Sequence, residues 1–229
     1  MYAVKNGAFP REELGFGARL LLGVKAALRL VVPTVFLSII LFASYFELED
    51  PIAVLDLFPP HLWQWNPGYW LTVGHLILPL AFFAVNLTNR RYGPGYALGQ
   101  VVASWALLGA ATFLIASEFG GMSSESLFPP QQTSMAFLGG FGLAQLVNIR
   151  VFDRTRGRTW WGAPLVSILW ASVIFVVVFY PVSMMGQGES FVPRLVTDLI
   201  LKSLSAVLLL APYFLLRPLI KSAPGYGGA

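Results

Sequence analysis

Long apolar runs joined by short polar connections make up most of this 229-residue chain. Six such runs follow one another, at roughly 28–46, 67–88, 96–117, 132–149, 163–183 and 195–216. A helix rises 1.5 Å per residue, so about 20 mostly apolar residues are needed to cross a membrane. The chain is 56% hydrophobic and 11% charged, which leaves too few charges to cover a water-facing surface. The sequence therefore predicts an all-α membrane protein, a bundle of six transmembrane helices.

Three regions follow from these runs. Residues 1–27 mix basic and apolar side chains in a pattern typical of an amphipathic helix at a membrane surface, and are predicted to be a cytoplasmic N-terminal segment. Residues 28–217 are predicted to form the six-helix transmembrane domain. Residues 218–229 end in a glycine-rich stretch with nothing of its own to pack against, and are predicted to be a cytoplasmic tail.

Basic residues mark the cytoplasmic side of a membrane protein, because insertion opposes their translocation. Here they gather on one predicted side: Lys5, Arg11, Arg19, Lys25, Arg29, Arg90, Arg91, Arg150, Arg154, Arg156, Arg158, Arg217 and Lys221. Only Arg194 flanks the other side. The pattern predicts a multi-pass protein of the bacterial inner membrane with both termini in the cytoplasm. The net charge of +4 therefore reflects topology, and no nucleic-acid partner is expected.

Several classes of chemistry lack their residues. The chain has no cysteine and only two histidines, so neither disulfides nor a metal site is expected. It contains no H-E-x-x-H motif, no G-x-S-x-G motif and no glycine-rich phosphate loop. We therefore predict that the protein is not an enzyme and that it carries no cofactor.

Polar side chains inside the apolar runs are the candidate functional residues, because a polar group at membrane depth is costly unless partnered. The candidates for substrate binding are Asn86, Arg90, Gln145, Asn148, Ser172, Asp198 and Lys202, and together they are predicted to line one central polar pocket. Two structural alternatives stay open: Asp198 and Lys202 at i, i+4 form only an intrahelical ion pair, or the amides only bond neighbouring helices. His75 is either a satisfied core histidine or a ligand for a pigment such as chlorophyll or haem. Gly139 and Gly142 indicate close helix packing.

Three segments resemble a known family in order along the chain. They are PLAFFAVNLTNRRYG at 79–93, GLAQLVNIRVFDRTRGRTWWGAP at 142–164, and Asp198, Lys202 and Pro212 in the sixth run. They are similar to motifs of the VUT family, the vitamin uptake or queuosine precursor transporters. The resemblance implies a six-helix bundle similar to the substrate-binding subunits of energy-coupling-factor transporters. It also implies import of 7-deazaguanine precursors of queuosine.

The chain departs from the family pattern where acids are expected. Asn86 and Asn148 stand where the family has aspartate, and Phe175 stands at a usually polar position, flanked by apolar residues that offer an acid no partner. Two functions therefore stay open. In the first, the chain imports a small 7-deazaguanine-like substrate. In the second, it is a non-transporting accessory subunit of a larger photosynthetic or respiratory membrane complex, bound to partner subunits and to a pigment or lipid. Membrane lipids are expected partners in both.

Overall fold

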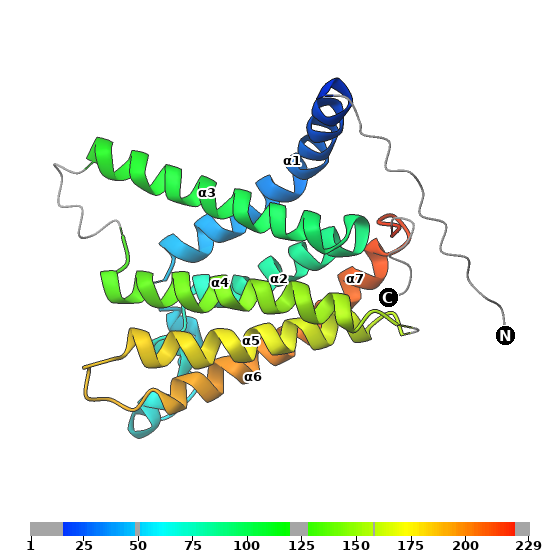
Figure 1. Cartoon of the computed structure of the whole chain (residues 1–229). Helices are drawn as coiled ribbons and strands as arrows, with labels where there is room; N and C mark the ends of the chain where they lie inside the picture. The colour runs from blue at the N-terminus through cyan, green and yellow to red at the C-terminus, as the bar shows by residue number, and fades with distance from the viewer. Residues whose placement is uncertain (1–15, 49–50, 120–127, 158, 223–229) are drawn as a thin grey trace.

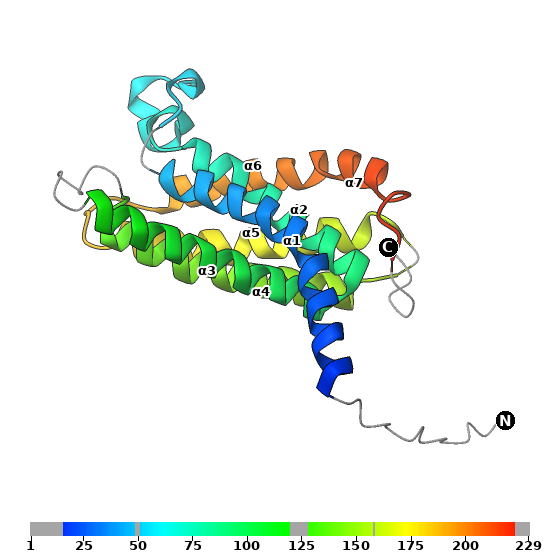
Figure 2. The ribbon, with the colours of Figure 1, turned by 90° about the horizontal axis from the view of Figure 1, so that it is seen from above.

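The structure, a computed structural model, describes residues 16–48, 51–119, 128–157 and 159–222. Within them the chain is helical and contains no β-strand. The helices are α1 (Phe16–Phe46), α2 (Val73–Tyr92), α3 (Pro94–Phe119), α4 (Gln131–Arg154), α5 (Gly162–Ser183), α6 (Val192–Leu208) and α7 (Leu210–Leu216). They lie side by side in one bundle (Figures 1 and 2). The prediction of an all-α protein is confirmed.

Five helical segments of the described residues are long and apolar enough to cross a membrane. They are Leu20–Phe46, Pro94–Glu118, Gln131–Arg154, Gly162–Ser183 and Val192–Leu216. The chain is therefore a multi-pass membrane protein in contact with lipid. Helix α2 is not among the five, because its sequence holds two asparagines and two arginines as well as His75. It packs against α1, α3, α4, α5 and α6, so protein groups surround those polar side chains. The predicted count of six crossings thus depends on α2.

Helix α1 joins the predicted N-terminal segment to the first run without a break. The described part of that segment, from Phe16, is already helical, while residues 1–15 lie outside the described residues. The first turns of α1 point away from the other helices in both views (Figures 1 and 2). Pro33 lies inside the helix and removes one backbone donor, and the Pro33 carbonyl accepts a hydrogen bond from Gln100 Nε2 at 2.9 Å. Residues 218–222 of the predicted tail have no helix, and 223–229 lie outside the described residues.

The second and sixth runs form shorter helices than the sequence predicts. Helix α2 begins at Val73 instead of 67, because the Thr72 side chain caps the helix by accepting the His75 backbone N–H. The sixth run breaks at Leu209 into α6 and α7. Pro212 follows within one turn, and since it has no backbone N–H it cannot donate the bond that would continue α6 through this point.

The bundle has two chemically different ends. At one end, α2 and α4 stop at Tyr92 and Arg154, and α7 stops at Leu216. Most of the predicted cytoplasmic arginines lie there, so we call it the basic end. At the other end, the segment 51–72 folds over the bundle through three 3-10 helices (Figure 1), and we call this the loop end.

One buried asparagine holds the segment at the loop end together. Asn66 is fully buried; its amide donates to Asp56 Oδ1 and to the Phe58 carbonyl at 3.3 Å. The Asn66 side-chain oxygen accepts the Leu57 backbone N–H at 3.1 Å. These bonds order a segment whose sequence, rich in proline and tryptophan, has no regular period. The segment can therefore place its aromatic side chains against the helices.

A glycine brings α4 and α5 close together, but it is not one of the two glycines predicted to do so. A Cβ atom at Gly139 or Gly142 would meet nothing within 4 Å. The glycine between them, Gly140, is the one that faces α5: its Cβ would lie 3.4 Å from the Phe175 carbonyl oxygen. The prediction named the wrong face of α4, because three neighbouring glycines do not indicate by themselves which one is buried.

Candidate functional site

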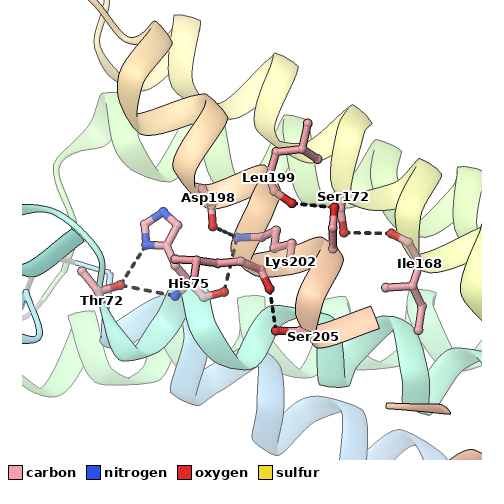
Figure 3. A network of polar contacts seen from close by, with 10 residues as sticks. Thr72, His75, Ile168, Ser172, Asp198, Leu199, Lys202 and Ser205 are labelled. Carbon is pink, nitrogen blue, oxygen red and sulfur yellow. Dashed lines mark hydrogen bonds and ion pairs between the residues drawn. The ribbon is translucent and has the colours of Figure 1, made fainter. Parts of the chain in front are cut away.

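An ion pair lies inside the bundle, where α6 packs against the start of α2. Asp198 and Lys202 are each 1% exposed, and Lys202 Nζ contacts Asp198 Oδ1. Lys202 Nζ also donates to the His75 backbone carbonyl at 3.3 Å (Figure 3). Two opposite charges one helical turn apart reduce the cost of burial, but do not remove it. Asp198 and Lys202 therefore form the intrahelical ion pair of the structural alternative, but they do not form only that pair, since Lys202 also bonds to α2.

His75 completes this group, which we call the ion-pair cluster (His75, Asp198 and Lys202). The imidazole Nδ1 lies 2.9 Å from Thr72 Oγ1 (Figure 3). The ring stacks on Tyr180 at a centroid distance of 6.1 Å and meets Phe179 edge-on at 5.2 Å. The other ring nitrogen, Nε2, is buried and has no hydrogen-bond partner among the described residues. His75 is thus only half satisfied as a core histidine.

A cavity of about 200 Å³ opens beside this cluster at the loop end. Its lining includes Trp70, Thr72, His75, Phe179, Tyr180 and Arg194. Three of these side chains bring a buried polar atom that no described residue partners: Trp70 Nε1, His75 Nε2 and the Tyr180 hydroxyl. Asp198 lies behind the lining: its Oδ2 is buried as well and interacts with the Tyr180 side chain, without a hydrogen bond of normal geometry. Buried polar atoms are normally paired, so three in one cavity lining indicate space for a polar occupant.

The predicted amides form a separate group, which we call the amide cluster (Asn86, Asn148 and Ser167). All three side chains are fully buried. Asn148 Nδ2 donates to Asn86 Oδ1 at 3.0 Å and to the Phe82 carbonyl at 3.2 Å. Asn86 Nδ2 donates to Ser167 Oγ at 2.9 Å. These bonds tie α2, α4 and α5 together, as the alternative for amides in a membrane bundle states.

The remaining candidates bond to other groups. The Trp105 indole N–H donates to Gln145 Oε1 at 2.6 Å, and Ser172 donates to the Ile168 carbonyl of its own helix at 2.8 Å. Arg90 donates through Nε to the Ile220 carbonyl at 3.0 Å, so it fastens the C-terminal segment at the basic end. The seven candidates therefore do not meet in one central pocket. The prediction of a single pocket is wrong in this respect. Helical spacing shows which residues share one face of a helix, but not at which level along the helix axis a neighbouring helix packs against that face.

Phe175 lies where the ion-pair cluster meets α5. It is fully buried, and Lys202 Nζ lies 5.0 Å from the centroid of its ring, within the range of a cation–π contact. The sequence predicted no partner for an acid at this position, which is wrong: the cation comes from α6, about 27 residues further along the chain. Neighbours in sequence do not show what faces a side chain across a helix interface.

A second, larger cavity differs in chemistry. It has a volume of about 450 Å³ and lies among α1, α2 and the C-terminal segment, with Leu28, Phe36 and Leu87 among its lining residues. Arg29 and Arg91 also line it. Its location along exposed, apolar parts of α1 suits lipid chains. The cavity at the loop end is the one with unpartnered polar atoms from several elements.

Sequence reasoning missed Trp70 and Tyr180. Trp70 lies in the proline- and tryptophan-rich stretch before α2, where aromatic residues are typical of a membrane surface, and Tyr180 lies near the end of an apolar run with only Ser183 as a polar neighbour at helical spacing. One feature of the sequence could have indicated Trp70: it lies, with Thr72, within the three residues before the start of α2 at Val73, and His75 follows within one turn. This feature indicates a site only when the position of α5, which brings Tyr180 against Trp70 and His75, is known.

Comparisons with known proteins agree with the motifs. A family described as "Putative vitamin uptake transporter" matches residues 72–216, more than half of the chain. A protein of Haemophilus influenzae named "Probable queuosine precursor transporter" is 29% identical over 128 residues, which cover 52% of this chain and 54% of that protein. The chain thus spans about half the length of this relative. No solved structure matches the chain. Except for Trp70, all the side chains of the ion-pair cluster and the cavity named above fall within the matched region.

Proposed function

This chain belongs to the vitamin uptake transporter family, and on that premise we propose that it imports 7-deazaguanine precursors of queuosine across the bacterial inner membrane. The similarity to the Haemophilus influenzae protein supports this choice of substrate class. The observation that carries the proposal is the ion-pair cluster beside a partly polar cavity. An ion pair at membrane depth is costly and is typically found where a solute or ion passes.

Six crossings and a cytoplasmic basic end belong to this proposal. Helix α2 supplies the sixth crossing, shielded by the five helices around it. The arginines that end α2 and α4, and Arg217 directly after α7, then all face the cytoplasm. With six crossings both ends of the chain lie on that side. The loop end faces outward, so the cavity receives solute from outside the cell.

Cysteine labelling tests this topology, because the chain has no cysteine of its own. Asn66 is a poor site because it is fully buried, whereas His61 at the loop end and Thr159 at the basic end are exposed. We expect His61→Cys to react with an impermeant maleimide in intact cells, and Thr159→Cys only after the membrane is opened. Labelling of Thr159→Cys in intact cells would contradict the proposed orientation.

Within the bundle, we assign solute contact first to the ion-pair cluster. Asn86, Gln145, Asn148 and Ser172 remain predicted contacts, but their hydrogen bonds to one another and to the helices favour a bracing role. Arg90 likewise has a structural partner at the basic end. A pigment on His75 does not suit a cavity of about 200 Å³, since pockets for drug-sized ligands already measure about 300–1,000 Å³. Neither comparison supports the accessory-subunit alternative.

Uptake in cells tests the function directly. Cells that lack their own importer and cannot synthesise the base would express the wild-type chain or the double variant Asp198→Asn/Lys202→Met, which removes both charges without leaving one unpaired. We expect labelled 7-deazaguanine to accumulate with the wild type and much less with the double variant at equal membrane levels. Wild-type uptake no higher than that of an empty vector would refute the proposal for this substrate.

A further inference from the structure

We propose that the cavity between Trp70, His75 and Tyr180 is the solute-binding site, and that it selects a flat, electrically neutral heterocycle carrying hydrogen-bond acceptors next to donors. This inference rests on the proposed transport function and names the site and the solute class. Two of the three residues, Trp70 and Tyr180, come from outside the set that the sequence pointed to. The Trp70, His75 and Tyr180 side chains are 7%, 4% and 3% exposed, so their polar atoms are withheld from bulk water.

The hydrogen-bonding capacity of the cavity follows from its unpartnered atoms. Trp70 Nε1 can only donate. The Thr72 hydroxyl oxygen accepts the His75 backbone N–H at 3.3 Å, so its own proton is free to be donated. Among the described residues, the acceptor within reach of that proton is His75 Nδ1. We therefore assign the hydroxyl as the donor to Nδ1, which places the imidazole proton on Nε2. His75 then presents a second donor.

The same cavity also offers acceptors. The Tyr180 hydroxyl can donate and accept; Asp198 Oδ2, next to Tyr180 and behind the lining, can only accept while the carboxylate is ionised, so it favours a Tyr180 hydroxyl that points its proton to Asp198 and its lone pairs to the cavity. Two N–H donors therefore lie near the acceptor of Tyr180. A carbonyl or ring nitrogen would suit the indole and imidazole N–H groups, and a ring N–H or an exocyclic amine would suit the Tyr180 hydroxyl oxygen. Purine-like rings carry both kinds of group on one edge.

The shape of the cavity limits the solute to a small planar ring system. At about 200 Å³ it has the volume of roughly seven waters of about 30 Å³ each. Phe179 and Tyr180 meet edge-on at 5.3 Å, and Trp70 meets Tyr180 edge-on at 6.0 Å, so aromatic surfaces bound it in two orientations. Such surfaces favour a flat aromatic solute through stacked or edge contacts.

The charges around the cavity favour a neutral solute. Lys202 is paired with Asp198, and Arg194 at the lining is paired with Glu189 at 3.0 Å. A cationic solute would find no carboxylate free of an existing cation, and it would lose its hydration on entry. A neutral base needs only the unpartnered donors and acceptors. The cavity therefore discriminates by charge even though it contains charged residues.

Binding to the purified full chain in detergent or nanodiscs tests the site. We expect neutral 7-deazaguanine to bind at least about tenfold more tightly than 7-aminomethyl-7-deazaguanine. Tyr180→Phe and Trp70→Phe should each weaken 7-deazaguanine binding by about threefold to tenfold, the effect of losing one hydrogen bond. Tyr180→Phe should lower the melting temperature of the ligand-free protein only slightly, because its hydroxyl forms no hydrogen bond of normal geometry there.

Tyr213→Phe is the matched control. Its hydroxyl is also buried without a hydrogen bond of normal geometry, and like Tyr180 it interacts with a charged side chain, here Arg90, but it lies on α7 at the basic end (Figure 1). We expect wild-type binding from this variant. Equal weakening by Tyr213→Phe, tighter binding of the amine, or wild-type binding by both cavity variants would overturn the site.

The outcomes separate the site from the function. If cells take up 7-deazaguanine while both cavity variants transport and bind like the wild type, the transport function stands and the site is overturned. If uptake fails but another neutral planar base binds with the same loss in Tyr180→Phe, the site stands and the substrate proposed above is wrong. If neither 7-deazaguanine nor guanine, adenine or hypoxanthine binds, the site is overturned.

Discussion

The amide cluster and the ion-pair cluster are both buried and polar, yet they differ in how far the protein satisfies them. In the amide cluster, both asparagine amide groups donate and the bonds join three helices; Asn148 Oδ1 is its one side-chain atom without a partner among the described residues, and no cavity described above is lined by it. In the ion-pair cluster, His75 Nε2 and Asp198 Oδ2 have no hydrogen-bond partner within the described part of the chain, and a cavity adjoins them. Burial alone therefore does not identify a binding site in a membrane bundle. Unused hydrogen-bonding capacity beside open volume does.

The largest expected effect concerns Phe175, at the border of the ion-pair cluster. Phe175→Asp removes a buried ring, which costs about 3–5 kcal/mol, and adds a charge that costs about 2.5–3.5 kcal/mol at membrane depth. Lys202 should offset part of the second cost. Phe141→Asp is the control, since Phe141 is equally buried and has no cation over its ring among the described residues. Unfolding in detergent should show the smaller loss at Phe175; equal losses would mean that Lys202 is not available to a new acid.

The next effect tests whether the ion pair acts as a unit. Asp198→Asn alone leaves Lys202 as a buried unpaired cation and should destabilise the protein by about 3–5 kcal/mol. Adding Lys202→Met should recover most of that loss, since the second change removes the stranded charge. Denaturation of the two variants in detergent provides the comparison. A double variant as unstable as the single one would show that the cost comes from packing and not from charge.

The smallest effect concerns the amide cluster. Asn148→Ala removes the donor to Asn86 Oδ1 and should cost about 1–3 kcal/mol of stability, the penalty for a buried acceptor left unpaired. Combined with Asn86→Ala, the two losses should not add, because the side chains bond each other. Affinity for 7-deazaguanine should stay near the wild-type value in the folded fraction. A tenfold loss of affinity would move the binding site from the cavity to the amides.

Much of the fold was predictable because long-range packing is not needed to predict a membrane helix. Local composition and length suffice for five of the runs, which the structure confirms as helices able to cross a membrane. The start of α2 was predicted too early, since the chain from 67 to 72 is apolar enough to extend the run. Its conformation is instead set by Pro67, by the Thr72 cap and by Asn66, which bonds to Asp56 ten residues earlier.

The candidate residues were predictable as buried groups, but not as a site. Every amide and charge singled out in the runs is buried, as the cost of exposing it to lipid requires. Which of them face a cavity depends on the depth at which α2, α4, α5 and α6 meet. The periodicity of a single helix carries no information about that depth. Trp70 and Tyr180 show the same limit, since each acquires a functional context only from a segment distant in sequence.

The sequence by itself determined that this chain is a multi-pass helical membrane protein of the vitamin uptake transporter family, because apolar length and local motifs are properties of contiguous residues. The tertiary structure decided that Lys202 reaches both the start of α2 and the ring of Phe175. It also decided that Asn86 and Asn148 bond each other, while Trp70 Nε1 and His75 Nε2 face a cavity without a partner among the described residues. The physical reason is that a hydrogen bond or ion pair between helices depends on which side chains meet in space, and residues far apart along the chain are brought together only by packing.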